Sequence, residues 1–428
     1  MLLWSAQAIS QTAQNAIWFA LMVLIEEATQ STTQVGIAII SFVLPSVLFT
    51  VPAGVLVDRV DKRLVLVSTN WLRAIVVLGY LIFSASVSAI YAVTFVFSII
   101  SQFFLPAESS MIPALVGRRR LMTANSLFNL TFTISQLVGI VLLAPVVIKL
   151  FGQNTLFLMI AVLFAVCGFL VLPLPSHRGH MPVPGEQPEE HPFRRFFGDV
   201  HDAFLFLRGD KLAAMAMVVL TVGATLSLIT AMIAPRFVVA VLGIRADDTV
   251  YVLAPAGLGM AIGAVAVGRL NRWLPKELLV VVGGLGVGVG LLLLAVVSPL
   301  WNLLFHGLLS MAVDPENHPK IVSLVSMVGL VAGVMGVALS MMLIPSQTML
   351  QEQAPAPSRG RIFAVQIMLG NLASVLPLLF VGGLADLLGV SVVLIGLAAG
   401  MFVLGYFAFR TFRGRIWGPP TAGALPPS

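Results

Sequence analysis

Arg73 and Glu108 are charged residues that lie inside long apolar stretches of the sequence. A charge surrounded by hydrocarbon is costly, so such residues usually form a pair or serve a function. Arg73 follows Arg63 by ten positions, and Glu108 precedes the basic cluster at 118–120 by ten. Because a helix rises about 1.5 Å per residue, both side chains should lie roughly 15 Å deep on consecutive helices. Two interpretations remain open: Glu108 exchanges a proton or holds a ligand under the influence of Arg73, or the two form a structural ion pair.

Amide side chains recur at helical spacing within three further apolar stretches, one of them near the N-terminus. Residues that are three or four positions apart share one face of a helix. Such polar faces either line a watery cavity or hydrogen-bond neighbouring helices. Both interpretations stay open, although we favour cavity lining in the first and third stretches. The candidates are Gln11, Gln14, Asn129, Gln136 and Gln347.

The histidines and the single cysteine do not form the clusters that catalysis or metal binding requires. All six histidines fall between apolar stretches, and none forms a helical metal-binding pair. Cys167 lies inside an apolar stretch, where a lone thiol usually packs as a small hydrophobic group. No glycine-rich phosphate-binding loop precedes a helix. The sequence therefore predicts neither an enzyme nor a metal or cofactor site.

The composition indicates a lipid environment. Of the 428 residues, 59% are apolar and only 10% are charged, and the mean hydropathy is +1.02. A soluble domain carries about a quarter charged residues, so most of this surface must face lipid. The formal net charge of +6 arises from short clusters between apolar stretches. Nucleic-acid binding is excluded, because no basic stripe interleaved with aromatic residues is present.

Apolar stretches of about 20 residues, the length that crosses a bilayer core about 30 Å thick, predict transmembrane helices. The chain is therefore predicted to be an all-α membrane protein with twelve transmembrane helices in two pseudo-symmetric six-helix bundles. The predicted spans are approximately 3–25, 34–57, 64–85, 88–113, 122–149, 154–174, 212–238, 250–268, 278–298, 322–350, 362–385 and 389–409.

The loops predict an orientation. An even number of spans places both termini on one side, and most of the 24 Lys and Arg residues fall in loops on that side. Cytoplasmic loops carry an excess of basic residues. We therefore expect both termini in the cytoplasm and the chain in the cell inner (plasma) membrane as a multi-pass protein. A miscount by one helix would reverse every later loop.

The two halves of the chain resemble each other. LPAESSMIPALVGRRRLMTANSL follows the fourth span and IPSQTMLQEQAPAPSRGRIFAVQ follows the tenth, which matches Glu108 with Gln347. In membrane proteins built from two six-helix repeats, the binding site lies between the repeats near the midplane. The predicted domains are an N-terminal bundle at 1–174, a cytoplasmic linker at 175–211, and a C-terminal bundle with a short cytoplasmic tail at 212–428.

Two connecting segments do not read as short turns. Within the linker, FRRFFGDVHDAFLFLRGDK places phenylalanines at helical spacing among basic residues, which is typical of an amphipathic helix on the inner membrane surface. A soluble regulatory helix is the alternative. The segment 299–320 is too short for an additional pair of spans, and we expect an interfacial helix on the outer side.

The loop after the second span reads GVLVDRVDKR, from residue 54 to residue 63. A glycine near a helix end lets another helix approach closely, and the first aspartate can accept hydrogen bonds from a neighbouring helix N-terminus. The basic residues hold the loop at the lipid headgroups. The residues concerned are Gly54, Asp58, Arg59, Lys62 and Arg63.

This loop resembles the signature between the second and third helices of the major facilitator superfamily. Within that superfamily, the branch of macrolide-efflux-like and enterobactin-exporter-like carriers is the most similar. The likeness extends along the chain through LLWSAQAIS, LPAESSMIPALV, TANSLF and RGRIFAVQ. The resemblance implies that the motif residues stabilise an outward-facing state, and that the first, fourth, seventh and tenth helices line the cavity.

The chain departs from the family pattern at three places. Asp61 stands where the motif usually has a second glycine. The second-half copy of the motif is degenerate, with Ala264 and Gly268 at the positions of glycine and aspartate. The antiporter pattern of the fifth helix is reduced to Gly139 followed by Pro145. An antiporter assignment therefore rests on the branch alone.

The resemblance implies a secondary active transporter that exports a small organic molecule by alternating access, with protons as the candidate coupling ion. An apolar cavity with a single deep acid favours an amphipathic or lipophilic substrate. The expected partners are this substrate, the lipid bilayer and protons, with the chain acting as a monomer. The alternative is a membrane receptor or scaffold on the same fold that does not transport, which substrate-dependent flux in vesicles would distinguish.

Overall fold

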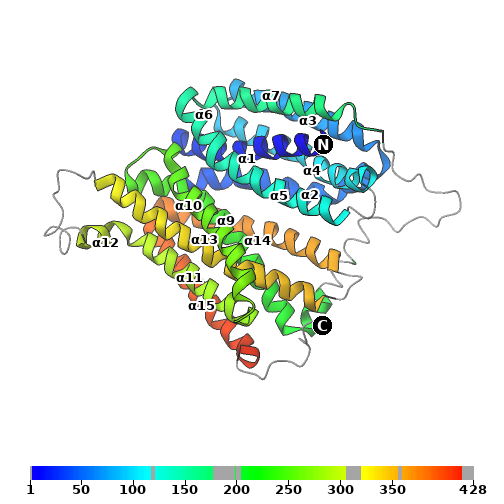
Figure 1. The fold of residues 1–428 in the computed structure, drawn as a ribbon. Coiled ribbons are helices and arrows are strands. Elements are labelled where there is room, and N and C mark those ends of the chain that lie inside the picture. Colours follow the sequence, from blue (N-terminus) through cyan, green and yellow to red (C-terminus); the bar gives the residue numbers. More distant parts are fainter. Residues whose placement is uncertain are drawn as a thin grey trace. The chain divides into compact units, whose positions relative to one another are not determined.

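The computed structural model describes residues 2–116, 121–176, 198, 204–304, 320–354 and 359–416. Throughout these ranges the regular structure is helical, and Figure 1 shows the helices along the chain. The helices that are long and apolar enough to cross a membrane number 12. The predicted all-α architecture with twelve spans is therefore confirmed.

The chain forms two compact units. Unit 1 contains residues 1–198 together with Arg245–Val250 and Val375–Gly382, and unit 2 contains the rest. The helices of unit 1 are α1 (Leu2–Thr29), α2 (Thr32–Arg59), α3 (Lys62–Ile82), α4 (Val87–Leu115), α5 (Leu121–Leu137), the π-helix η2 (Val138–Leu143), α6 (Ala144–Phe151), α7 (Gln153–Val171) and the 3-10 helix η4 (Ala246–Thr249).

Unit 2 contains most of the remaining helices. They are α9 (Lys211–Phe237) with the π-helix η3 (Val238–Leu242), α10 (Val250–Leu270), α11 (Lys276–Ala295), α12 (Val297–Leu304), α13 (Lys320–Gln353), α14 (Arg359–Leu388) and α15 (Val390–Ile416). The segment Val375–Gly382 of α14 belongs to unit 1, as does the first residue of α10.

Helices begin where a short polar side chain caps the free backbone N–H groups of the first turn. Ser31, Asp61, Ser86 and Asp210 each precede a long helix and accept a hydrogen bond from a backbone N–H of its first turn. Such caps satisfy donors that the helix itself leaves unpaired. The cap residues therefore set the starts of α2, α3, α4 and α9.

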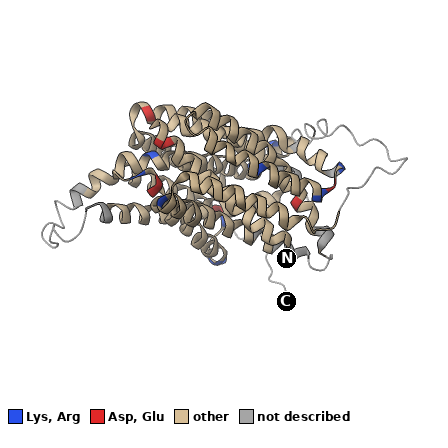
Figure 2. Cartoon of the chain, turned by 90° about the horizontal axis from the view of Figure 1, so that it is seen from above, with Lys and Arg blue, Asp and Glu red and all other residues tan. Residues whose placement is uncertain are grey.

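The helices expose apolar side chains as lipid-facing helices do. Ile82, Leu330 and Phe380 are among many large hydrophobic residues that are exposed. A soluble monomer rarely exposes contiguous apolar surface on this scale. In Figure 2, residues other than Lys, Arg, Asp and Glu make up most of the helical ribbon.

The fifth predicted span is not one regular helix. It runs through α5, the π-helix η2 and α6, so that the hydrogen-bond register changes at Val138–Leu143. Gly139 in η2 lies against α1: an ideal Cβ at Gly139 would be 2.5 Å from the carbonyl oxygen of Thr12 and 2.8 Å from Cβ of Asn15. The absence of a side chain therefore lets η2 and α1 meet backbone to backbone.

The glycines of unit 2 serve the same purpose around α13. A Cβ at Gly259 or Gly336 would collide with the facing backbone across the α10–α13 contact. On the other side of α13, a Cβ at Gly283 of α11 would be 2.5 Å from the backbone nitrogen of Met342. Helices in membranes pack closely through small residues, and α13 is held in this way.

The two irregular connections are described only in part. In the linker, residues 204–209 are helical, and the guanidinium of Arg208 lies 4.8 Å from the centre of the Phe204 ring. Most of the predicted amphipathic helix lies outside the described residues. At the second connection, α12 covers the first part of the predicted interfacial helix, and 305–319 lie outside the described residues.

Candidate functional site

Arg73 lies in the interior of unit 1. Its residue is 1% exposed, and α3 carries it on the same face as Thr69, Asn70 and Val77, which are also buried. An arginine keeps its charge under all physiological conditions, so burial requires hydrogen-bond acceptors for the guanidinium. The side chains around Arg73 therefore decide how this charge is tolerated.

The guanidinium of Arg73 connects three helices. Its Nη1 donates to Ser10 Oγ on α1 at 3.1 Å, and its Nη2 donates to the carbonyl oxygen of Ser101 on α4 at 3.3 Å. Ser10 in turn donates to Oδ1 of Asn70 on α3 at 3.5 Å, and Asn70 donates to the carbonyl oxygen of Leu66. A charged group of α3 is therefore bound to α1 through one hydroxyl.

Aromatic rings cover part of the guanidinium. Its central carbon lies 4.4 Å from the centre of the Phe104 ring on α4 and 5.6 Å from that of Phe164 on α7. A guanidinium within about 6 Å of an aromatic face is stabilised electrostatically, and more so where water is absent. Phe104 is also a member of the apolar core that includes Leu66, Ala107 and Val171. This core separates the charge from water.

Glu108 is fully buried on α4, at 0% exposure, and neither of its carboxyl oxygens has a hydrogen-bond partner among the residues that the structure describes. Its neighbours along the helix, Ala107, Met111 and Ile112, belong to the same apolar core. Arg73 of α3 and Cys167 of α7 lie close enough to Glu108 to interact with it electrostatically. The structure thus brings Arg73 and Glu108 into one region, but the guanidinium is bound by Ser10 and Ser101 instead of the carboxyl.

The predicted amide faces divide between packing and exposure. Near the N-terminus, Gln11 is buried and Gln14 is half-buried. Gln136 on α5 and Gln347 on α13 are exposed, and the side chain of Asn129 lies outside what the structure describes. Exposed amides on spanning helices are available to a ligand or to water, whereas Gln11 accepts a hydrogen bond at its backbone oxygen from Asn15.

Hydroxyl groups bond neighbouring helices through partners that the sequence did not indicate. Ser135 of α5 donates to the carbonyl oxygen of Ala8 on α1 at 3.1 Å, and Ser340 of α13 donates to that of Met260 on α10 at 2.8 Å. Serines within apolar helices bond neighbouring helices in this way. The spacing of serines alone carries no signal for these partners.

The loop between α2 and α3 is shaped by Asp61. Its Oδ1 accepts the backbone N–H of Arg63 at 3.0 Å and its Oδ2 accepts a hydrogen bond from Ser176, just after α7. The residue that departs from the family pattern is therefore the N-cap of α3. A glycine at this position could not provide these bonds.

The other motif residues are placed differently from one another. Lys62 is buried at the start of α3 and Arg59 is exposed at the end of α2. An ideal Cβ at Gly54 would meet no other atom within 4 Å in the described part of the chain. The side chain of Asp58 lies outside what the structure describes.

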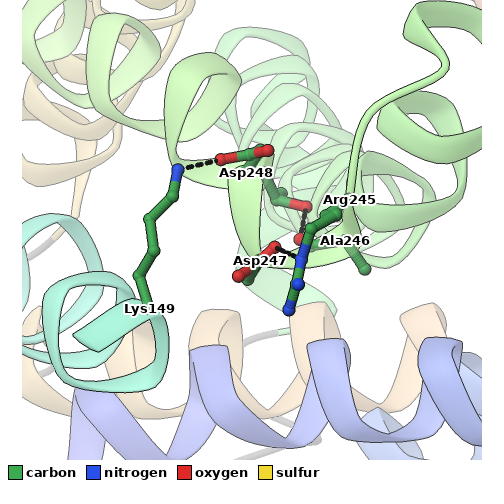
Figure 3. A network of polar contacts seen from close by, with 6 residues as sticks. Lys149, Arg245, Ala246, Asp247 and Asp248 are labelled. Carbon is green, nitrogen blue, oxygen red and sulfur yellow. Dashed lines mark hydrogen bonds and ion pairs between the residues drawn. The ribbon is translucent and has the colours of Figure 1, made fainter. Parts of the chain in front are cut away.

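A second polar cluster, which sequence reasoning missed, lies where η4 packs in unit 1 (Figure 3). Nζ of Lys149 at the end of α6 is 2.5 Å from Oδ1 of Asp248, and Nε of Arg245 donates to Oδ1 of Asp247 at 3.1 Å. The hydrogen bond to Asp247 raises the pKa of the exposed Arg245 guanidinium above its ordinary value. The Asp247–Asp248 pair just before a span was the available signal.

No metal centre is indicated among the residues that the structure describes, where no three His, Cys, Asp or Glu side chains come together as they would around an ion. Among the described charged groups of unit 1, Arg73 is bound by neutral groups and Lys149 and Arg245 pair with aspartates, whereas Glu108 has no hydrogen-bond partner.

Comparison with known protein families gives a match over most of the chain. A family model described as the Major Facilitator Superfamily matches residues 3–377. The uncharacterized MFS-type transporter YkuC of Bacillus subtilis (strain 168) is 24% identical over 199 residues, which are 45% of this chain and 45% of that protein. The aligned part of the chain thus spans less than half the length of this curated relative.

Solved structures share the fold along nearly the whole chain. The nucleoside transporter NupG superposes with a TM-score of 0.72 at 14% identity, covering 96% of this chain and 98% of that one. A POT family transporter in complex with 5-aminolevulinic acid gives a TM-score of 0.70 at 12% identity, covering 97% and 96%. The POT family transporter PepTSo gives 0.67 at 12% identity, covering 98% of each. At these identities the likeness concerns the fold.

Proposed function

Because this chain belongs to the major facilitator superfamily, we propose that it is a secondary active transporter that exports a small amphipathic or lipophilic organic molecule by alternating access. Membership makes it a multi-pass membrane protein of a family of small-molecule transporters. The direction of transport, the substrate class and the energy source form the proposal. Nucleoside and peptide carriers share its fold at 16% identity or less, so their substrates are not transferred to it.

The substrate class is supported by where the polar groups lie. The buried charges Arg73 and Glu108 are enclosed by the apolar core of unit 1, so they do not present an open charged surface. The exposed polar groups at the candidate positions are the amides Gln136 and Gln347. Apolar surface with a few amides binds amphipathic molecules, because binding sites for such ligands are mostly apolar with a few placed polar groups.

The loop between α2 and α3 is proposed as the conformational switch. A buried lysine and a capped helix start are consistent with a loop that is held in one arrangement. In the proposal, the carboxylate of Asp58 and its basic neighbours stabilise the outward-facing state. The residues are Gly54, Asp58, Arg59, Lys62 and Arg63.

We place both termini in the cytoplasm of a cell inner membrane, since the basic loops of the chain lie on the side of its ends and cytoplasmic loops are basic. Protons are the proposed coupling ion in an exchange for substrate. The proposal assigns transport to a single chain and assigns it no nucleic-acid partner. A pH gradient that is acidic outside the cell would then drive export.

The test is flux in proteoliposomes that hold the purified full-length chain. The panel contains a lipophilic cation, an uncharged macrolide, a nucleoside and a dipeptide, each with and without an imposed pH gradient. We expect the lipophilic cation or the macrolide to accumulate against its gradient only when the pH gradient is present. Binding without flux would indicate a receptor, and movement of the nucleoside or dipeptide alone would contradict the substrate class.

A matched pair of amide variants sharpens the test. Gln347→Ala removes an exposed amide of α13. Ser109→Ala removes an exposed hydroxyl of α4 whose hydrogen bonds, in the described part of the chain, are to its own helix. We expect Gln347→Ala to weaken the apparent affinity for the transported compound about 5- to 13-fold, the loss typical of one hydrogen bond of about 1–1.5 kcal/mol. Ser109→Ala should leave the affinity unchanged.

A further inference from the structure

We propose that Glu108 binds a proton in this conformation, and that the proton decides whether Arg73 of α3 holds α1 through Ser10. The inference deepens the proposed function, on which its transport meaning rests, because it assigns the coupling proton a site and a structural consequence. It requires no identified substrate.

The first step is the geometry of one face of α4. Ser101, Phe104 and Glu108 are spaced at i, i+3 and i+7, so they follow one another along a single face of the helix. Arg73 bonds the carbonyl oxygen of Ser101 and lies over the ring of Phe104. Glu108 is the next group on this face, about 6 Å further along the helix axis, one turn beyond Phe104. The guanidinium therefore lies on the face of α4 that carries Glu108, and the two groups are close enough to interact electrostatically.

The surroundings of Glu108 decide its protonation state. An ionised carboxylate without hydrogen bonds is strongly disfavoured in an apolar interior, and a carboxyl in such a place becomes neutral instead. Glu108 is fully buried, and within the described part of the chain neither of its carboxyl oxygens has a hydrogen-bond partner. If it were ionised, it would draw the guanidinium into a paired, charge-assisted contact, which is the stronger bond. The guanidinium is on Ser10 and Ser101, as expected beside a neutral carboxyl.

The charged and titratable groups around Glu108 are few among the described side chains. Arg73 of α3 acts directly on it, and Cys167 of α7 faces both. On α1 the nearest polar group of the network is the hydroxyl of Ser10, and α2 contributes the apolar Val57 to the surrounding core. When Glu108 loses its proton, Arg73 is the one cation among the described surroundings that can compensate the negative charge of the carboxylate.

The third step is the consequence for α1. Ser10 is the one side chain of α1 that receives a hydrogen bond from the guanidinium among the described residues. Loss of the proton from Glu108 favours movement of the guanidinium toward the carboxylate and away from Ser10. Protonation restores the bond between α3 and α1. Glu108 is therefore the proton-binding residue, and Arg73 and Ser10 are positioning residues that convert its protonation into a change of helix contact.

Infrared difference spectroscopy of the purified full-length protein tests the proton directly. We expect wild type minus Glu108→Gln to show the C=O band of a protonated carboxyl at neutral pH, and Glu108→Asp to shift that band. Glu27→Gln, which removes an exposed acid of α1, should leave it in place. Absence of the band at neutral pH overturns the proposal. If Glu108→Gln does not fold, the shift in Glu108→Asp provides the same assignment.

A second variant tests the connection to α1. Ser10→Ala removes the acceptor that holds the guanidinium, so Arg73 becomes free to pair with the carboxylate, and the protonated-carboxyl band should disappear at a lower pH than in wild type. Ser68→Ala removes an exposed hydroxyl of α3 and should leave the titration unchanged. If the protonated-carboxyl band of Ser10→Ala disappears at the same pH as that of wild type, the proposed link between Glu108 and the Arg73–Ser10 hydrogen bond is refuted, even if the band itself is present.

The transport assay separates this inference from the proposed function. In the same proteoliposomes, Glu108→Gln should abolish the part of accumulation that depends on the pH gradient, while downhill movement continues. Proton-driven flux that survives in Glu108→Gln overturns the site while the transport function stands. A protonated-carboxyl band in a protein that moves no compound leaves the proton site in place and refutes the transport function.

Discussion

The contact between α1 and the π-helix η2 is predicted to tolerate no side chain at Gly139. An ideal Cβ there would be 2.5 Å from the Thr12 carbonyl oxygen, 2.8 Å from Cβ of Asn15 and 3.1 Å from the Ala16 nitrogen. Two of these three atoms belong to the backbone of α1, so no rotamer change removes the overlap. Gly139→Ala must therefore move one helix relative to the other.

Gly54→Ala is the matched control, because an ideal Cβ there would meet no atom within 4 Å in the described part of the chain. Both substitutions gain helix propensity, about 1 kcal/mol from glycine to alanine. Only Gly139→Ala also bears the cost of overpacking, about 1–3 kcal/mol. The gain cancels in the comparison, so the two variants should differ by about 1–3 kcal/mol in the free energy of unfolding.

The measurement is the thermal unfolding midpoint of each purified variant in the same detergent. At about 2–4 °C per kcal/mol for a domain of 150–250 residues, Gly139→Ala should unfold roughly 2–12 °C below Gly54→Ala. An equal or higher midpoint for Gly139→Ala would refute the reasoning. It would mean that η2 and α1 do not meet backbone to backbone in the protein.

Three further predictions use the same measurement. In α11, Gly283→Ala should be destabilised by about 1–3 kcal/mol relative to the control Gly284→Ala. A Cβ at Gly283 would meet the backbone of α13, whereas the nearest atom to a Cβ at Gly284 is 3.6 Å away. Equal midpoints of the two variants would contradict this packing. Asp61→Ala should lose about 0.5–2 kcal/mol as the cap of α3, with Asp61→Ser as the control that retains a cap, and a stable Asp61→Ala would show that the cap is dispensable. Lys149→Ala removes an ion pair whose lysine is 52% exposed, so we expect a change below about 1 kcal/mol, and a larger loss would show that η4 depends on this contact.

Hydropathy predicted the architecture because its cause is local. The spans follow from runs of about 20 apolar residues, and the length of a run can be counted directly in the sequence. The predicted span 250–268 and the observed α10, Val250–Leu270, differ by two residues at one end. The span 122–149 shows the limit of the method, since hydropathy is blind to the change of register at η2. A π-turn depends on the helix that packs against it.

The buried charges show a similar division. Spacing indicated that Arg73 and Glu108 lie at comparable depth, and it could suggest an ion pair or a proton site. It could not reveal that Ser10 and the Ser101 carbonyl bind the guanidinium, because those partners depend on which faces of α1 and α4 turn inward. The contact of Lys149 with Asp248, 99 positions away, was beyond sequence reasoning for the same cause.

The internal repeat also has different consequences in the two units. The sequence matches Glu108 with Gln347, yet Glu108 is fully buried beside a guanidinium while Gln347 is exposed on α13. Unit 2 packs α13 against α10 and α11 through glycines, whereas unit 1 has a charged and hydroxyl-rich network around Arg73 of α3. Backbone-to-backbone packing through glycine has no titratable member, so it cannot respond to a proton. Protonation can change a helix contact in the packing around Arg73 but not in the glycine packing around α13. The proton site is therefore proposed at Glu108 and not at its counterpart Gln347.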